Sequence, residues 1–262
     1  MPQNDKDIME YPEPGSVETR IREVAYRQGA ALCILLDPDR NTPDELSRAA
    51  AISQEGEADF IFVGSSLMLS GNFEQAVPEV QQACDLPVVI FPGHSSQVTA
   101  GADAILFLSL ISGRNADYLI GQHVVAAPRI HELGLEAIPT GYMLIESGNI
   151  TSAQYMSMTA PMPRDKPDIA VAHALAARFL GMRFVYLECG SGGELSVPEE
   201  IIHRVSRTAR LPVIVGGGIR TPEAARAKVE AGASCIVIGN SLEDAWTPDR
   251  VREISGAVHA LR

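Results

Sequence analysis

The sequence predicts an α/β fold, a closed (β/α)8 TIM-like barrel, and three observations carry the prediction. Eight short apolar runs recur along the 262 residues, and helix-sized segments separate most of them. The runs are rich in β-branched residues and do not alternate with polar ones, a pattern typical of parallel strands buried on both faces. The last two runs each end in a glycine turn, and a single barrel usually takes about 250 residues. We therefore expect one barrel domain over residues 16–262, preceded by a flexible N-terminal arm over residues 1–15.

The predicted strands follow one another in chain order, each ending at a polar residue or a glycine. They cover residues 31–36, 60–63, 87–91, 104–108, 136–142 with a continuation to 145, 184–187, 211–215 and 235–238. Residues 16–28 form an amphipathic helix ahead of the first strand, which we expect to cover the bottom of the barrel. Thr42 and Thr221 each combine an N-cap with proline at the first helical position, and Ser196 is expected to start a helix in a similar way.

One connection is too short for a regular barrel. About a dozen residues, 92–103, separate the third strand from the fourth, and this length does not accommodate a barrel helix with its two loops. We therefore expect a modified barrel that lacks the helix between strands 3 and 4. The gap is either a trimmed loop or a side cleft into which a long ligand fits.

Composition excludes several classes of protein. The net charge is −12 and there is no basic block, so the sequence does not indicate binding to nucleic acid. No apolar run approaches the roughly 20 residues of a membrane span. We expect a cytoplasmic protein without stable membrane insertion. The four widely spaced cysteines form no C-x-x-C pair, and we interpret them as thiols in a reducing compartment, not as disulfides or a zinc site.

Two glycine turns close the last two predicted strands. The first is Gly216-Gly217-Gly218 and the second is Gly239-Asn240. Glycine lets a phosphate oxygen approach backbone N–H groups because no Cβ stands in the way. A helix after each turn adds the positive end of its dipole. One such turn often marks only a bend, but two on consecutive final strands indicate a phosphate-binding site.

Asp37 and Ser66 stand at the ends of the first two strands, on the face where barrel enzymes carry their active sites. A carboxylate and a hydroxyl suit Mg²⁺, which takes few protein oxygens and completes its shell with water and substrate phosphate. Two other interpretations stay open. Asp37 could be an N-cap or form an Asx turn in the Asp37-Pro38-Asp39 run, and Ser66 could cap the following helix.

Glu188 ends the sixth strand, and Tyr186 lies two residues earlier on the same strand face. Burial at the end of an apolar strand would raise the pKa of the Glu188 carboxyl and suit it to act as a general base. The alternatives are an ion pair with an arginine for Glu188 and a core position for Tyr186. His94 is interpreted as a loop residue, and His123 is expected to be solvated or to cap its helix.

Several motifs taken together resemble a known family. They are Leu36-Asp37-Pro38-Asp39, Val63-Gly64-Ser65-Ser66, Tyr186-Leu187-Glu188-Cys189-Gly190-Ser191-Gly192, Val215-Gly216-Gly217-Gly218-Ile219-Arg220 and Ile238-Gly239-Asn240. In this order they resemble the geranylgeranylglyceryl phosphate synthase family, which also includes the bacterial heptaprenylglyceryl phosphate synthases. The resemblance covers about residues 20–245, and the run around Glu188 is its most specific element.

The resemblance implies a barrel without its third helix and a Mg²⁺-dependent prenyl transfer. The 3-hydroxyl of sn-glycerol 1-phosphate attacks C1 of a polyprenyl diphosphate, with geranylgeranyl as the expected chain, and pyrophosphate leaves. Asp37 and Ser66 would be the metal ligands, and Glu188 the base, assisted by Tyr186. The glycerol 1-phosphate site would comprise Tyr186, Leu187, Glu188, Cys189, Gly190, Ser191, Gly192, Gly216, Gly217, Gly218, Gly239 and Asn240.

The sequence departs from one branch of that family. The branch has a lysine two residues before the metal aspartate, where this chain has Leu35. The chain therefore resembles the other branch, for which we expect a homo-oligomer, a dimer or a hexamer, and Arg40 could supply the missing cation.

Two further functions are considered. Another phosphate-binding barrel, a sugar-phosphate isomerase or a cyclase, would share the glycine turns but would not explain residues 186–192 or the missing helix. A catalytically silent barrel that binds a phosphate or a lipid would have no need for the carboxylates Asp37 and Glu188, because such groups are costly to bury.

Overall fold

The computed structural model describes residues 13–69, 72–239 and 247–259. Its strands form a closed parallel barrel in chain order, and β8 pairs with β1. Their bounds are β1 Ala31–Leu36, β2 Phe60–Val63, β3 Val88–Ile90, β4 Ala104–Leu110, β5 Glu136–Leu144, β6 Phe184–Glu188, β7 Val213–Gly216 and β8 Cys235–Ile238. The predicted fold class is confirmed, and the strand bounds differ from the prediction by one or two residues where they differ at all.

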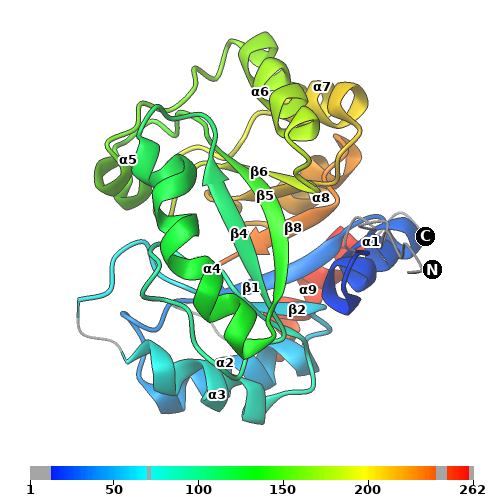
Figure 1. Cartoon of the computed structure of the whole chain (residues 1–262). Helices are drawn as coiled ribbons and strands as arrows, with labels where there is room; N and C mark the ends of the chain where they lie inside the picture. Colours follow the sequence, from blue (N-terminus) through cyan, green and yellow to red (C-terminus); the bar gives the residue numbers. More distant parts are fainter. Residues whose placement is uncertain (1–12, 70–71, 240–246, 260–262) are drawn as a thin grey trace, which may run out of the picture.

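Helices surround the barrel (Figure 1). Those of the described ranges are α1 Ser16–Gln28, α2 Pro43–Glu55, α3 Phe73–Ala83, α4 Gln122–Leu133, α5 Ser152–Ser157, α6 Pro167–Phe179, α7 Glu199–Ala209, α8 Pro222–Glu230 and α9 Pro248–Val258, with a single π-helical turn, η1 Asp117–Gly121, leading into α4. Thr42 and Thr221 cap α2 and α8 as predicted. The expectation for Ser196 is wrong: Pro198 is still extended, so α7 begins only at Glu199 and has no side-chain cap.

Apolar side chains pack in two layers. One layer fills the barrel interior and includes Phe60, Phe62, Phe184 and Tyr186. The other lies between the strands and the outer helices. Since successive residues of a strand point to opposite sides, each strand supplies both layers in alternation. This explains why the sequence shows continuous apolar runs.

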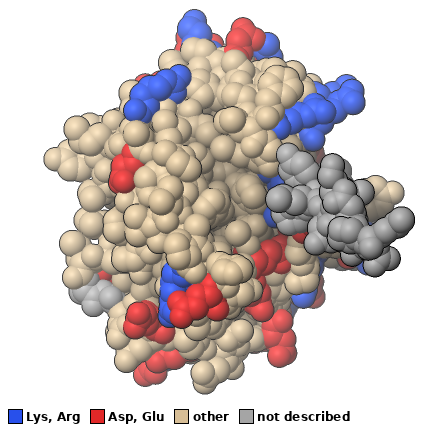
Figure 2. All heavy atoms as spheres, viewed as in Figure 1, with Lys and Arg blue, Asp and Glu red and all other residues tan. Residues whose placement is uncertain are grey.

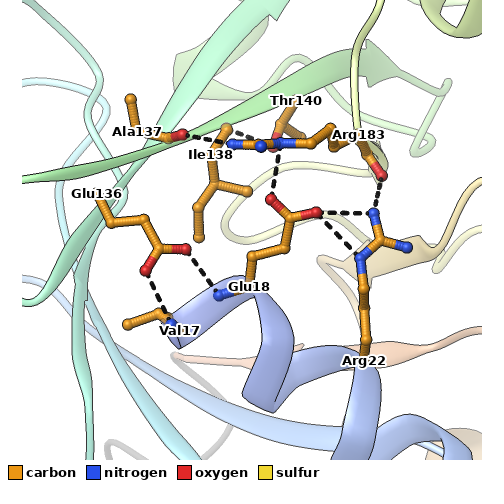
Figure 3. A network of polar contacts seen from close by, with 8 residues as sticks. All are labelled: Val17, Glu18, Arg22, Glu136, Ala137, Ile138, Thr140 and Arg183. Carbon is orange, nitrogen blue, oxygen red and sulfur yellow. Dashed lines mark hydrogen bonds and ion pairs between the residues drawn. The ribbon is translucent and has the colours of Figure 1, made fainter. Parts of the chain in front are cut away.

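Helix α1 covers the amino-terminal end of the barrel, opposite α5 (Figure 1). Its Val17 and Ile21 belong to the interior layer. The Glu136 carboxylate at the start of β5 accepts hydrogen bonds from the backbone N–H groups of Val17 and Glu18, both at 2.8 Å. Figure 3 shows these contacts, with the buried Glu18 carboxylate between Arg22 and Arg183. The predicted cover at the bottom of the barrel is confirmed.

No helix stands between β3 and β4 in the structure, and residues 91–103 connect them directly. The expected modified barrel is confirmed. The side chain of Gln97, 2% exposed, ties this connection to the loop after β2. The predicted arm, residues 1–15, lies outside the described residues except for 13–15, and its extent stays a prediction. Among the helices described, none has the length and apolar character needed to cross a membrane.

Candidate active site

Two cavities open at the carboxyl end of the barrel. The inner cavity, about 920 Å³ including space open to solvent, is lined mainly by the ends of β6, β7 and β8. The outer cleft, about 1120 Å³ on the same measure, runs from the ends of β1 and β2 toward α4. The residues common to both walls are Leu35, Ser66, Phe91, Tyr142, Ala153 and Ser191. The two spaces are therefore continuous.

Glycine turns form much of the inner wall. Gly217 and Gly218 have φ angles of 80° and 70°, and Gly190 and Gly192 have φ angles of 83° and 78°. These left-handed conformations favour glycine over any other residue. A Cβ added at Gly217 would lie 2.5 Å from Oε1 of Glu188. Space and conformation thus both require glycine here, and successive N–H groups in turns of this kind can cradle an anion. Asn240 lies outside the described residues, whereas Gly239 lines the cavity.

The carboxyl group of Glu188 points into the inner cavity and is almost completely buried. Burial raises its pKa to about 7, although hydrogen bonds from the N–H of Gly190, from the Tyr186 side chain and from the N–H of Cys189 oppose the shift. Within the described ranges Glu188 has no salt bridge, so the ion-pair interpretation is not supported. A carboxylate with a pKa near neutrality is suited to accept a proton.

Tyr186 lies beside Glu188 and is fully buried. Burial raises the pKa of its phenol well above the ordinary value, and the neighbouring Glu188 charge adds to the effect. The Tyr186 hydroxyl lies against the Glu188 carboxyl and has no other hydrogen-bond partner among the described residues. It also lies where a Cβ on Gly216 would collide with it, at 2.2 Å. A buried hydroxyl so placed, next to the cavity, can also bond a ligand.

The side chains of the run around Glu188 divide between two environments. Tyr186, Glu188, Gly190, Ser191 and Gly192 line the inner cavity. By contrast, the side chains of Leu187 and Cys189 belong to the outer apolar layer. Burial raises the pKa of the Cys189 thiol to about 12, so the thiol stays protonated. Leu187 and Cys189 can therefore serve the site only through their backbone.

Asp37 and Ser66 line the outer cleft near its junction with the inner cavity. The N–H of Asp39 donates to Oδ1 of Asp37 at 3.0 Å, which is the Asx turn considered above, and Nε of Arg40 lies 3.5 Å from Oδ2. Burial raises the pKa of Asp37, while these contacts lower it. The capping interpretation of Ser66 is wrong, since Asn72 caps α3.

The oxygen donors at this end of the cleft decide whether Mg²⁺ can bind there. Within the described ranges no cluster of three or more His, Cys, Asp or Glu side chains could hold a metal ion. Asp37 and Ser66 offer a carboxylate and a hydroxyl on one wall, which fits an ion that takes most of its oxygens from water and phosphate. Arg40 adds a cation beside Asp37, with its Nε 3.5 Å from Oδ2.

The outer cleft follows the gap left by the missing helix. It passes Phe91 and Phe107 and ends between β4 and α4, where it is lined by His123, Ala126 and Ile130. The prediction of a side cleft is confirmed. The expectation for His123 is wrong: the residue is 8% exposed, its ring meets that of Phe107 edge-on at 4.6 Å, and burial lowers its pKa. No helix stands between β3 and β4 to cover this face.

Three wall residues were not predicted as site residues. Phe91 and Tyr142 stand at the junction of the cavities, and Arg220 lines the inner cavity beside the glycine turns. Arg220 donates to the carbonyl of Gly193 at 3.1 Å, which places its guanidinium across the cavity wall. The sequence signal that could have identified Arg220 is its position directly after the Gly-Gly-Gly-Ile run. Phe91 and Tyr142 gave no signal beyond their place at strand ends.

Known proteins resemble this chain over nearly its whole length. The family model described as the PcrB family matches residues 24–258. The geranylgeranylglyceryl phosphate synthase of Chitinophaga pinensis is 44% identical over 230 residues, covering 88% of this chain and 90% of the relative. The protein of that name from Thermococcus kodakarensis is 42% identical, covering 91% and 94%.

Solved structures agree with the sequence comparisons. The (S)-3-O-geranylgeranylglyceryl phosphate synthase of Thermoplasma acidophilum, solved in complex with sn-glycerol-1-phosphate, has a TM-score of 0.88 and 34% identity, covering 95% of this chain and 100% of that one. A thiamine phosphate pyrophosphorylase from Pyrococcus furiosus has a TM-score of 0.57 at 14% identity, with 90% and 98% coverage. That second likeness concerns the fold alone.

Proposed function

The chain belongs to the PcrB family, and from that premise we propose that it transfers a polyprenyl group to the 3-hydroxyl of sn-glycerol 1-phosphate. Geranylgeranyl diphosphate is the expected donor, and the products are an ether-linked prenylglyceryl phosphate and pyrophosphate. The observation that carries the proposal is the pair of joined cavities. One is polar, glycine-lined and holds Glu188, and the other is long and apolar. A small phosphorylated alcohol fits the first, and a prenyl chain fits the second.

The inner cavity would hold the nucleophile. The phosphate of glycerol 1-phosphate would bind the backbone N–H groups of Ser191, Gly192, Gly217 and Gly218, together with Arg220, while the N–H of Gly190 holds the Glu188 carboxylate. Gly239 and Asn240 are proposed to complete this clamp, and Leu187 and Cys189 to support it through their backbone. The 3-hydroxyl then faces Glu188, whose carboxylate takes the proton as the oxygen bonds to C1. The Tyr186 hydroxyl lies beside this carboxylate and is placed to orient it.

The outer cleft would hold the donor. Its diphosphate lies at the end formed by Asp37, Ser66 and Arg40, and its prenyl chain extends between β4 and α4. Mg²⁺, when bound by Asp37 and Ser66, would neutralise charge on the diphosphate and so favour its departure. The apolar walls keep water away from C1, which protects the donor from hydrolysis.

The test is a direct assay of the purified protein. With Mg²⁺, sn-glycerol 1-phosphate and labelled prenyl diphosphates from farnesyl to heptaprenyl, we expect an ether-linked phosphate product that resists mild acid. Chelation by EDTA should abolish the reaction, and excess Mg²⁺ should restore it. Asp37→Asn should raise the Mg²⁺ concentration required, whereas Asp44→Asn, an exposed carboxylate in the first turn of α2, should not. The absence of product with every chain length would contradict the proposal.

We also propose that the chain forms a homo-oligomer, a dimer or a hexamer. Exposed apolar side chains support this: Val124 and Val125 on α4 are 66% and 67% exposed, and Phe179 and Leu180 at the end of α6 are 81% and 73% exposed. Figure 2 shows a largely uncharged face over α4 and α5, with most charged residues toward its edges. Light scattering coupled to size exclusion should give a mass of two or six chains, and a monomer at micromolar concentration would contradict the proposal.

A further inference from the structure

An aromatic cluster lies where the two cavities meet. Phe91 follows β3, Tyr142 lies on β5 and Tyr186 on β6. The rings of Phe91 and Tyr186 are stacked, with centroids 5.1 Å apart and planes 17° apart. Tyr142 stands at a steep angle to both, with centroids 6.0 Å from Phe91 and 5.3 Å from Tyr186. The register pairs Tyr142 with Tyr186 across neighbouring strands, which fixes their separation.

The rings of the cluster differ in what they offer to a ligand. Tyr186 is fully buried, whereas Phe91 and Tyr142 are partly exposed and line both cavities. Because Tyr186 stacks on one face of Phe91, the part of the Phe91 ring that lines the cavities lies outside that contact. Phe62, the next ring at 6.3 Å, is fully buried and lines neither cavity.

The position of Phe91 between the two substrates defines its chemical surroundings. Ser66, which we propose binds the diphosphate end of the donor, lies at the same junction as Phe91. Glu188, which we propose accepts the proton of the hydroxyl, lies in the inner cavity. C1 of the prenyl chain has to lie between the departing diphosphate and the incoming hydroxyl, and hence at this junction. The backbone holds Phe91 there, because its N–H donates to the carbonyl oxygen of Val63 at 2.9 Å. Gly64 allows this close approach, since a Cβ at Gly64 would lie 1.8 Å from the Phe91 carbonyl oxygen.

The reaction creates positive charge at that point. As the bond between C1 and the diphosphate oxygen breaks, its electron pair leaves with the diphosphate, and the allylic carbons gain cationic character. The 3-hydroxyl oxygen then bonds to C1, and its proton passes to Glu188. An aromatic face attracts a cation through its quadrupole, most strongly where water is excluded, and it offers no nucleophile that would capture C1.

We propose that Phe91 is a further catalytic residue, whose ring face stabilises the allylic cation during prenyl transfer, with Tyr186 stacked behind it. The inference rests on the proposed function. It adds a role in the transition state to a residue that would otherwise only shape the wall. Interactions made only in the transition state change kcat and leave substrate binding unaltered.

The test replaces Phe91 by phenylalanines that carry one, two and three ring fluorines. Fluorine withdraws electrons from the ring face and changes the ring volume little. We expect kcat to fall stepwise with the number of fluorines, by about thirtyfold over the series, a size typical of a desolvated cation–π contact. The KM for glycerol 1-phosphate should stay constant. Phe91→Tyr, which keeps an electron-rich ring, should retain most of kcat, and Phe91→Leu should not.

The same fluorine series at Phe62 is the matched control, since that ring packs edge-on against Phe91 but lines neither cavity. Its kcat should stay constant. A flat series at Phe91, or an equal fall at Phe62, would overturn the inference while the wild-type protein still makes product. If the wild-type protein makes no product, the proposed function itself fails, and this outcome is distinct.

Discussion

The side-chain amide of Gln97 donates a hydrogen bond to the carbonyl oxygen of Ser65 at 2.8 Å. The same side chain accepts from the N–H of Gly93 at 3.1 Å. Gln97 is 2% exposed, so water does not replace these contacts. One buried amide thus joins the loop after β2, which carries Ser66, to the loop after β3, which carries Phe91. This barrel lacks the helix between β3 and β4. The hydrogen bonds of this amide therefore hold the two loops together, where in other barrels helix packing would contribute.

We predict that Gln97→Leu destabilises the protein and misplaces both loops. The variant leaves the Ser65 carbonyl and the Gly93 N–H without partners, at a cost of about 1–3 kcal/mol for each buried group left unsatisfied. Denaturant unfolding should show the loss, and the KM for the prenyl diphosphate should rise. Gln81→Leu, at an exposed position of α3, is the control and should change neither quantity. Equal stability of the two variants would contradict the role given to Gln97.

Glu188→Gln should abolish most turnover and leave both substrates bound. General-base catalysis is typically worth a factor of 10²–10⁴, and kcat should fall by about that amount. In the wild-type protein the pKa of about 7 sets the pH dependence. Below that pH the base is protonated, so kcat should fall about tenfold for each pH unit, and above it kcat should level off. A variant within tenfold of the wild-type kcat, or a flat profile between pH 5 and 8, would exclude Glu188 as the base.

The same substitution should stabilise the fold at high pH. The pKa of Glu188 is raised from 4.5 to about 7 in the folded protein, so between these values the folded state holds a proton that the unfolded state releases. The free energy of unfolding therefore decreases as the pH rises through this window, by roughly 3 kcal/mol in total. Glu188→Gln removes this loss. The free energy of unfolding of Glu188→Gln, measured by denaturant unfolding, should increase relative to that of the wild type from pH 5 to pH 8. Glu230→Gln, at an exposed position, should show no such increase.

Gly217→Ala should impair binding of glycerol 1-phosphate. The residue has a φ of 80°, and the added methyl group would lie 2.5 Å from Oε1 of Glu188. The turn must then shift, which moves the N–H groups proposed to hold the phosphate. We expect the KM for glycerol 1-phosphate to rise at least about tenfold, the equivalent of one lost hydrogen bond to a charged group. Gly134→Ala is the matched control: its φ is 66°, an added Cβ meets nothing within 4 Å, and it ends α4 far from the glycine turns. It should lower stability and leave that KM unchanged.

The sequence predicts the barrel well because each strand carries its own signal. Glu188 and Tyr186 were predicted together from strand alternation, and the same alternation explains why Leu187 and Cys189 face the outer layer although the motif contains them. His123 was missed for a different reason. Whether a helix residue meets a cavity depends on what packs against that helix, and here the absence of a neighbouring helix leaves α4 lining the cleft. Whether Phe91 meets the cavities depends in the same way on the loop after β3, whose course the sequence does not show.

The length of the prenyl chain should depend on Ala126. This residue lines the part of the cleft between β4 and α4, together with Ile105 and Ile130, and it is 8% exposed. A larger side chain at this point would fill the end of the cleft, so Ala126→Phe should lower kcat/KM for geranylgeranyl diphosphate far more than for farnesyl diphosphate. Competition between the two donors gives this ratio directly. Ala127→Phe makes the same change one position along α4 but on its exposed side, and it should leave the ratio unaltered. If both variants keep the wild-type ratio of kcat/KM for the two donors, the prenyl chain does not reach α4, and the cleft beyond Phe107 is not the prenyl site.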